Sequence, residues 1–526
     1  MRAPRPPLAA FTRRRLLRQL GAWSGIGAGF WLLAACGGTN GPSTAAGTSG
    51  GASSSAAASS VPSTAAATAG ALTTSASTSV GGTASAVPTS ASTAVAASSP
   101  LASGNAATST ASASAKPPAQ GAVTLSYWAF GGGAPLGDQL FRLPADNYAK
   151  DSAGKVAVNY TDISSAQIEE KALTAWVSGS GPDVLFDSSR GFLRFMDSDI
   201  FLDVAPDFAQ RKLNRSDWYQ VSLDFFQVKG QQFGMPQGFG TQPYGLNLDL
   251  LQKAGVTLAP GFDQTWGQDE LVQMLKQIVR YAPNGMETPG GDDDSVLNNW
   301  LWNYGSDLVS ADLLSSPAAN AGGIDAATWY QQAHTGQRVF MRPTIDYPAN
   351  VSFAAGNVAM TGNGAEPSVL STWGRLPFKN NIFLRPKGPA DHLTRLYIDG
   401  FYVWNKTRVR DTAVDFLFYL TNQGCTQMDN GGGYNIPAYR PVVEKVFLPR
   451  PSNLNKQVWL TSAEHSRTDP RHPKWIPDIN TVYGKYNTAL RTGSMAPRDA
   501  MQAMAQEITV ILQLYAKTPG YQRLVG

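Results

Sequence analysis

The sequence predicts an α/β fold built on a mainly parallel sheet, because strand and helix patterns alternate at the start of the folded region. Strands are expected at 123–128, 155–160 and 183–186, and helices at 140–150 and 166–178. Alternation of this kind is typical of parallel strands joined by crossover helices that cover both faces of a sheet.

The individual elements carry recognisable signals. The run Val123–Trp128 has a strand pattern that stops at the glycine-rich turn 131–133. In the second predicted helix, Ile168, Ala172 and Trp176 recur at helical spacing, which predicts one buried face.

Residues 1–35 are predicted to be a secretory signal peptide. They hold six arginines and no acidic residue, and they end in an apolar run from Leu20 to Ala35. A charged start followed by a short apolar stretch defines such a signal. The arginines at 13–15, with leucines behind them, resemble a twin-arginine signal.

Cys36 is the predicted lipidation site. It follows Leu33, Ala34 and Ala35, and the four residues together resemble a bacterial lipobox. A diacylglyceryl group on the cysteine supplies the acyl chains that stable membrane anchoring needs. The alternative is an uncleaved anchor helix that holds a cysteine by chance. We therefore expect an extracytoplasmic protein, lipid-anchored to the outer face of the cell membrane.

Residues 36–121 are predicted to form a disordered tether. They are almost entirely Ser, Ala, Thr, Gly and Pro, with Lys116 as their one charged residue and no aromatic side chain. Such a composition buries too little apolar surface to offset the entropy of ordering. The segment is a flexible spacer, and O-glycosylation of its hydroxyls is an open alternative.

Residues 122–526 form the predicted folded region, and its charge excludes one class of partner. The net charge of +4 comes from the N-terminal segments, since 35 basic and 38 acidic residues remain beyond residue 121. A slightly acidic surface does not favour nucleic-acid binding.

The two cysteines, Cys36 and Cys425, cannot build a disulfide framework or a zinc site, and Cys425 is expected to be a buried, inert thiol.

An ordered series of motifs in this region resembles the family 1 extracellular solute-binding proteins of bacterial ABC importers, the group that includes the maltose-binding protein. Gly-Ser-Gly-Pro-Asp-Val at 179–184 carries the likeness most clearly. Further matching motifs follow in order: Leu202–Val204, Lys229–Pro236, Tyr244–Gly255, Thr265–Leu271, Phe353–Met360 and Asn435–Arg440.

The resemblance implies two α/β lobes, each a mainly parallel sheet flanked by helices, with a ligand held between them. Lobe 1 is expected to comprise about 122–237 and 399–440, and lobe 2 about 244–394 and 441–526. Hinge crossings are expected near 237–244 and 394–399 and after about residue 440. The implied partners are a small solute and the permease subunits of an ABC transporter. A monomer without cofactor, metal or catalytic residues is expected.

The expected ligand-binding residues are polar and aromatic side chains near strand ends or in segments that match the family's cleft. They are Trp128, Phe130, Asp187, Arg190, Gln237, Trp302, Tyr304, Asn363, Asp399, Tyr434 and Tyr483. Each has an ordinary alternative, such as core packing for Trp128 or a helix N-cap for Asp187. Among the crowded rings Trp300, Trp302 and Tyr304, we expect Trp302 or Tyr304 to form a binding platform.

Aromatic platforms with polar rims suit the apolar faces and hydroxyl edges of sugars, so a carbohydrate ligand is expected. Two other functions stay open: an exported enzyme that acts on polysaccharide through paired carboxylates, and a receptor for a signalling partner. None of the four histidines has the spacing of a metal site. His465 and His472 lie in a polar, proline-rich stretch and are expected at the surface.

The lipidation prediction is tested by replacing the acceptor thiol. Cys36→Ser removes the sulfur that bears the lipid, so we expect the variant to move from the membrane fraction to the soluble fraction, measured by fractionation and immunoblotting. A variant that stays with the membranes contradicts the assignment of Cys36.

Overall fold

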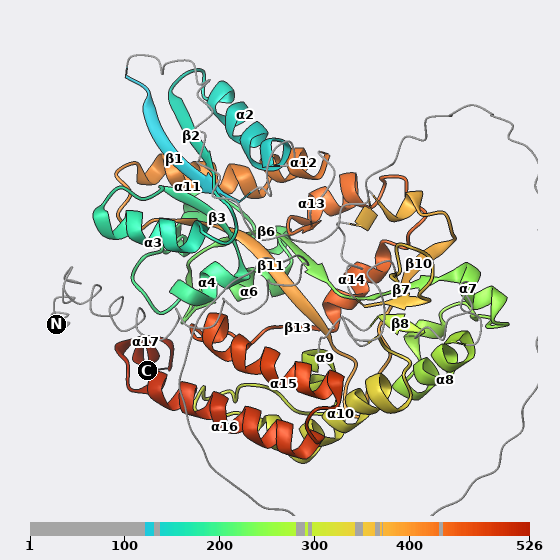
Figure 1. Ribbon diagram of the computed structural model, residues 1–526. Coiled ribbons are helices and arrows are strands. Elements are labelled where there is room, and N and C mark those ends of the chain that lie inside the picture. Colours follow the sequence, from blue (N-terminus) through green and yellow to red (C-terminus); the bar gives the residue numbers. More distant parts are fainter. Residues whose placement is uncertain are drawn as a thin grey trace, which may run out of the picture. The chain divides into compact units, whose positions relative to one another are not determined.

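The computed structural model describes residues 121–130, 137–279, 290–292, 297–341, 351–362, 369–370, 372–430 and 435–525 (Figure 1). All of them belong to one structural unit, Ser109–Gly526. Cys36, Asn363 and Tyr434 lie outside the described residues.

The larger sheet of the described region has seven strands. Its order is β12-β6-β11-β3-β1-β2, and β13 pairs with one end of β11. The strands are β1 (Val123–Ala129), β2 (Val156–Asp162), β3 (Val184–Ser188), β6 (Met235–Thr241), β11 (Thr394–Val403), β12 (Ile436–Pro437) and β13 (Ser466–Thr468). β2 and β3 both run parallel to β1, which confirms the parallel arrangement that the sequence predicts for this part of the chain.

Helices from distant parts of the sequence cover the two faces of this sheet. On one face, the ring of Phe416 in α11 (Arg410–Thr421) lies 5.2 Å from that of Tyr127 in β1. On the other face, Phe192 in α4 (Ser189–Phe195) and Phe226, which follows α6 (Gln220–Phe225), pack around Tyr402 of β11. The first lobe also contains η1 (Asp138–Arg142), α2 (Leu143–Asp151), α3 (Ile168–Ser178), α5 (Ala205–Gln210), η2 (Arg215–Asp217), α12 (Gln423–Asn430) and the ribbon β4 (Gln227–Val228) and β5 (Gln231–Gln232).

The glycine-proline motif after α3 has a structural role in the first lobe. Gly179 caps α3 in the left-handed conformation, with φ of 79°. A Cβ at Gly181 would lie 2.1 Å from the Trp176 ring, whose indole N–H donates to the Pro182 carbonyl at 3.0 Å. The Asp183 carboxylate accepts from the Ser126 amide at 2.8 Å. The motif therefore fixes the entry into β3 and joins it to β1.

The second sheet of the described region has four strands in the order β10-β7-β9-β8. They are β7 (Tyr244–Asn247), β8 (Gly291–Asp292), β9 (Met360–Thr361) and β10 (Asn380–Phe383). Here the expectation of a mainly parallel sheet is wrong, since β7 pairs antiparallel with both β10 and β9. The chain enters this lobe through β7 and returns toward the first lobe through β10, so these adjacent strands run in opposite directions.

The remaining helices of the described region include α9 (Leu297–Asn303), which holds the predicted aromatic run. They are α7 (Leu248–Lys253), η3 (Phe262–Gln264), α8 (Gln268–Val279), α9 (Leu297–Asn303), η4 (Pro317–Ala319), α10 (Ala321–Gln331), η5 (Gln332–Gly336), η7 (Trp373–Arg375), α13 (Arg440–Val442), η8 (Val443–Phe447), α14 (Gln457–Glu464), η9 (Trp475–Ile479), α15 (Asn480–Thr492), α16 (Pro497–Ala516) and α17 (Pro519–Val525). Every residue of α9 is buried, and the Trp300 ring packs 4.1 Å from that of Trp329 in α10. Trp300 is therefore a core residue.

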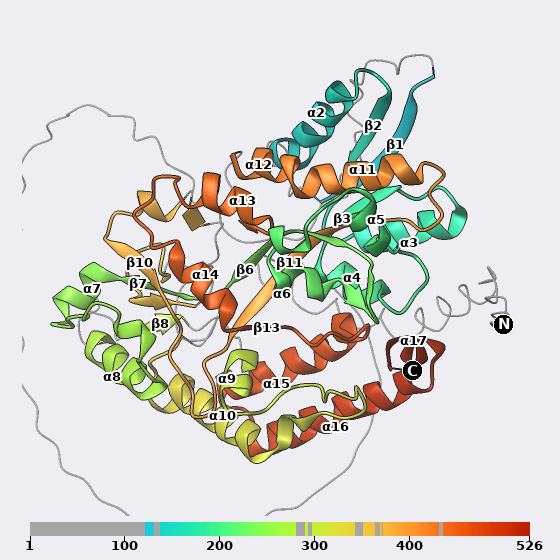
Figure 2. The same ribbon diagram turned by 180° about the vertical axis from the view of Figure 1, so that it is seen from behind.

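Two strands carry the chain between the sheets (Figures 1 and 2). β6 ends at Thr241, and only Gln242 and Pro243 separate it from β7 of the second sheet. β11 begins beside β13 and extends over ten residues until it pairs with β3. These crossings lie in the segments that the family resemblance assigns to hinges.

His472 corrects one expectation from the sequence. Its side chain is fully buried rather than at the surface, and its ring lies 4.6 Å from that of Tyr515 in α16. Burial lowers the pKa of His472 to about 3, so the imidazole is neutral at physiological pH. The polar, proline-rich sequence around it gave no sign that α16 would cover it. His465 is exposed, as expected.

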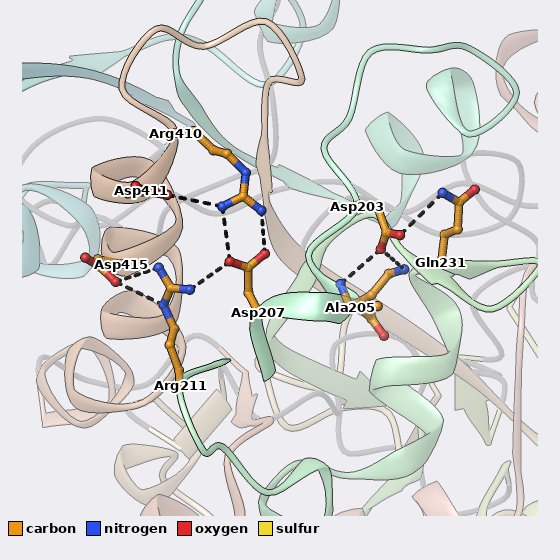
Figure 3. Close-up of polar contacts among 9 residues, drawn as sticks. Asp203, Ala205, Asp207, Arg211, Gln231, Arg410, Asp411 and Asp415 are labelled. Atoms are coloured by element: carbon orange, nitrogen blue, oxygen red, sulfur yellow. Dashed lines mark hydrogen bonds and ion pairs between the residues drawn. The ribbon is translucent and has the colours of Figure 1, made fainter. Parts of the chain in front are cut away.

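A buried carboxylate joins the first lobe across a long sequence separation. Asp207 in α5 is fully buried and pairs with Arg211 at 2.7 Å and with Arg410 of α11 at 2.9 Å (Figure 3). Nearby, Asp203 accepts from the Ala205 and Gln232 amides at 3.0 and 2.9 Å, which fixes the start of α5. These contacts hold α5 against elements that lie before and after the second lobe in the sequence.

Removal of the buried carboxylate tests this assembly of the first lobe. Asp207→Ala deprives two arginines of their shared partner, so we expect the free energy of unfolding to fall by about 2–4 kcal/mol. Denaturant titration followed by circular dichroism measures this change. Asp411 is the matched control, because it pairs with the same Arg410 at 3.3 Å but its side chain is 89% exposed. Asp411→Ala should change stability by less than about 0.5 kcal/mol. Equal effects of the two variants would contradict the role of Asp207.

Candidate functional site

Three predicted ligand residues lie on adjacent strands where the first sheet meets the crossings. Asp187 is at the end of β3, Asp399 is on β11, and Gln237 is on β6, and β11 pairs with both neighbours. The register of β6 against β11 shifts at Asp399 and Gly400, so Gln237 is the extra residue of a β-bulge. Bulges commonly redirect side chains beside functional sites. The fold thus brings together residues that lie up to 212 positions apart in the sequence.

Asp187 is buried with half of its carboxylate unpartnered. Its Oδ1 accepts from the Ser188 amide at 2.7 Å, and its Oδ2 has no hydrogen-bond partner within the described part of the chain. A Cβ at Gly191 would lie 2.1 Å from Oδ2, so only glycine leaves room for this carboxylate against α4. Burial, assisted by Glu169, raises the pKa of Asp187 well above its ordinary value, although the Ser188 amide and Arg190 oppose the rise. Ser188, rather than Asp187, is the N-cap residue of α4.

Asp399 is buried within a small polar cluster. Its Oδ2 accepts from the Asn435 side-chain amide at 2.7 Å. Burial raises the pKa of Asp399 to about 7, against the opposing effect of the Asn435 hydrogen bond. A proton at this position is therefore retained close to neutral pH.

Asp187 and Asp399 do not form a facing pair of carboxylates. Asp187 is opposite Gly400 in the register, whereas Asp399 is opposite Ser188. Because successive side chains alternate across a strand, the two acids lie on opposite faces of the sheet. A glycosidase needs two carboxyl groups on either side of one bond. These two strand-end acids do not meet that requirement.

The sequence interpretation missed Arg395 and Tyr397, which alternate with Asp399 along β11. Both are half-buried, whereas Leu396 and Ile398 between them are buried. The Arg395 guanidinium makes two bonds to Asp469, at 2.9 and 2.6 Å, and the Asn298 amide of α9 contacts the same carboxylate at 3.4 Å. Counting back in steps of two from Asp399 would have found Arg395 and Tyr397. Asp469 and Asn298 left no comparable signal in the sequence.

The predicted aromatic platforms of the second lobe are largely covered in this structure. The Trp302 side chain is 3% exposed, its indole N–H donates to Asp307 at 3.2 Å, and the Arg467 guanidinium lies 5.5 Å from its ring. A ligand would have to displace Arg467 to reach this ring. The Tyr304 hydroxyl accepts from the Gln268 amide at 2.7 Å. Whether either ring contacts a ligand stays a prediction.

The other predicted residues are dispersed around these groups. Trp128 is half-buried on the face of β1 opposite Tyr127, and the Phe130 ring lies 5.2 Å from that of Phe186. The Arg190 side chain is 52% exposed and lies 3.9 Å from the Glu169 carboxylate. Tyr483, in α15, is half-buried beside Trp475. Their role in binding also stays a prediction.

A separate open cavity of about 580 Å³ lies between α6 and the second lobe. Its lining includes Phe225 of α6, Asp307 beyond α9, and Arg467 of β13. None of the nine predicted ligand residues that the structure describes lines it, although Asp307 and Arg467 both contact Trp302. The cavity therefore adjoins the predicted second-lobe platform without including it.

The described residues contain no cluster of three or more histidine, cysteine or acidic side chains able to hold a metal ion. Within the same residues, every helix is too short or too polar to span a membrane.

The ionisation of Asp399 predicts a pH-dependent stability. Its pKa is about 7 in the folded protein and 3.8 ordinarily, so the folded state retains the proton more tightly between these values. Stability from this group is greatest below about pH 4 and falls as the pH rises to 7. Asp399→Asn removes the ionisation and keeps an oxygen for Asn435. Relative to the wild type, the variant should therefore gain about 2–4 kcal/mol between pH 4 and pH 8. Unfolding titrations of the unliganded proteins measure this gain, and parallel pH profiles would contradict it.

Comparisons with known proteins agree with this architecture. No curated protein matches the chain in sequence. Among solved structures, the cyclic α-maltosyl-1,6-maltose binding protein from Arthrobacter globiformis has a TM-score of 0.62 and 17% identity, covering 75% of this chain and 100% of that one. An ABC substrate-binding protein from Listeria monocytogenes in complex with cycloalternan has a TM-score of 0.60 and 17% identity, covering 74% and 99%. UgpB from Mycobacterium tuberculosis, in complex with glycerophosphocholine, has a TM-score of 0.61 and 16% identity, covering 75% and 99%.

At these identities the structural likenesses establish the two-lobed fold alone. The family follows from the sequence, because the profile of the bacterial extracellular solute-binding proteins matches residues 134–424, more than half of the chain. The chain belongs to the family of bacterial extracellular solute-binding proteins.

Proposed function

We propose that this protein is the extracytoplasmic receptor of an ABC importer, and that it captures a sugar or oligosaccharide between its lobes and delivers it to the membrane permease. Family membership supports the receptor function. The similar protein from Arthrobacter globiformis is named for binding cyclic α-maltosyl-1,6-maltose, and the one from Listeria monocytogenes was solved in complex with cycloalternan. Both support the ligand class. The predicted signal peptide and the predicted lipidation site at Cys36 support a lipid-anchored receptor outside the cell.

The observation that carries the proposal is the set of buried polar side chains where β3, β11 and β6 meet. Asp187, Gln237 and Asp399 are all almost fully buried, and Asp187 and Gln237 each have an oxygen without a hydrogen-bond partner among the described residues. Buried polar atoms without partners are costly, and a ligand that hydrogen-bonds to them recovers part of that cost. Sugar hydroxyls both donate and accept, so they suit carboxyl and amide oxygens alike.

The same arrangement favours binding over catalysis. Asp187 and Asp399 lie on opposite faces of the sheet, so they do not flank one bond as the two carboxyl groups of a glycosidase do. A receptor that serves a signalling partner has the same binding site as one that serves transport, so the choice of transport rests on the family.

A thermal-shift screen tests the proposed ligand class. The full-length Cys36→Ser variant is heated with each member of a panel of maltodextrins, cyclic oligosaccharides and monosaccharides, and with glycerophosphocholine. A ligand at a hundred times its Kd stabilises the native state by about 2.7 kcal/mol, which raises the melting temperature clearly. We expect at least one sugar to do so. Stabilisation by glycerophosphocholine alone would overturn the carbohydrate assignment and leave the receptor function in place.

A further inference from the structure

The C-terminal segment of the second lobe makes a direct contact with the first lobe. The hydroxyl of Tyr515, near the end of α16, donates to Asp197 Oδ2 at 2.9 Å. Asp197 follows α4 on the first lobe, and the two residues are 318 positions apart in the sequence. Figures 1 and 2 show α17 at the end of α16 that lies toward α4.

Gly520 of α17 completes this contact. A Cβ at Gly520 would lie 2.0 Å from Asp197 Oδ2 and 3.1 Å from the Tyr515 hydroxyl. Only glycine therefore allows α17 to lie this close to the carboxylate. We call Asp197, Tyr515 and Gly520 the C-terminal clasp.

Several further contacts surround the clasp and also join the lobes. The Arg523 guanidinium donates to the Asp197 carbonyl at 3.5 Å, and the Lys229 ammonium donates to the Gln522 carbonyl at 3.3 Å. Within the second lobe, the buried His472 ring packs edge-on against Tyr515. α17 is thus held to the first lobe through both side-chain and backbone groups, although α16 belongs to the second lobe.

The clasp forms in an arrangement in which the candidate ligand residues are shielded from solvent. Asp187, Gln237, Asp399 and Trp302 are all almost fully buried. In the same arrangement α4 of the first lobe lies against η9 of the second. Hinge motions turn lobes as rigid bodies about a few residues, so a contact between the lobes must lengthen or break when they separate.

From these contacts we infer that the C-terminal clasp is a conformational latch, which stabilises the arrangement of the two lobes seen in this structure. A contact present in only one of two states shifts their populations by its own free energy. The latch therefore sets how often the unliganded receptor opens, and with it the apparent ligand affinity. The inference does not depend on which solute is bound.

Distance measurements in the unliganded protein test the latch. Spin labels are placed at Leu143→Cys on α2 and Val510→Cys on α16, because these side chains are 46% and 50% exposed on different lobes. The background is the full-length Cys36→Ser chain, in which the remaining Cys425 is buried and escapes labelling. Pulsed electron paramagnetic resonance gives the distribution of distances between the labels.

Tyr515→Phe removes the hydroxyl and keeps the ring. Loss of a hydrogen bond to a carboxylate should raise the ratio of released to clasped molecules by about tenfold. A second peak or a clear broadening of the distance distribution is the expected result. Asp197→Asn and Gly520→Ala disturb the same contact from its other two sides and should give the same change, so they decide the question if the first variant fails to fold.

Tyr486→Phe is the matched control. Tyr486 is 3% exposed, as is Tyr515, and its hydroxyl donates to the Glu507 carboxylate at 2.5 Å. That bond joins α15 to α16 inside the second lobe, so its loss should leave the distance distribution unchanged. The latch is overturned if the clasp variants also leave the distribution unchanged, or if Tyr486→Phe changes it equally.

Discussion

The hydrogen bonding of β11 is the constraint on which the rest of the structure depends. Over ten residues this strand pairs with β13, then with β6, and finally with β3. Each backbone amide and carbonyl in a buried strand needs a partner, so β11 fixes the position of every neighbour. Because β11 is shared between the crossing region and the first sheet, the first lobe cannot be completed until the chain has returned from the second.

This late completion explains why the first lobe is joined by long-range polar contacts. Asp207 in α5 binds Arg410 of α11, and Asp183 before β3 accepts from the Thr407 hydroxyl at 2.6 Å, across a gap that contains the second lobe. Such buried charges are costly unless they are fully paired. Their pairing ties the returning segment to one position and so favours a single arrangement of the sheet.

The same crossing concentrates the polar groups of the candidate site. A ligand in an open α/β sheet lies beyond the carboxyl ends of parallel strands, and the end of β3 contributes Asp187. β11 and β6 add Asp399 and Gln237 at the β-bulge between these two strands. The motif at 179–184, which carries the family resemblance most clearly, has a structural role instead, since Gly181 and Asp183 shape the entry into β3. The family motif and the candidate ligand residue Asp187 are thus different residues of one segment.

The sequence alone determined the order of β1, α3 and β3, the receptor family and the segments that cross between the lobes, because these depend on local periodicity and on short motifs. It also placed Asp187 after a strand, and the family resemblance placed Gln237 at a crossing and Asp399 in a cleft segment. Tertiary structure decided the antiparallel second sheet, the burial of His472 under α16, and the core position of Trp300. It also decided that Arg395 meets Asp469 and that Tyr515 meets Asp197. Each of these outcomes depends on which distant element covers a residue, and local sequence patterns carry no information about contacts made across hundreds of residues.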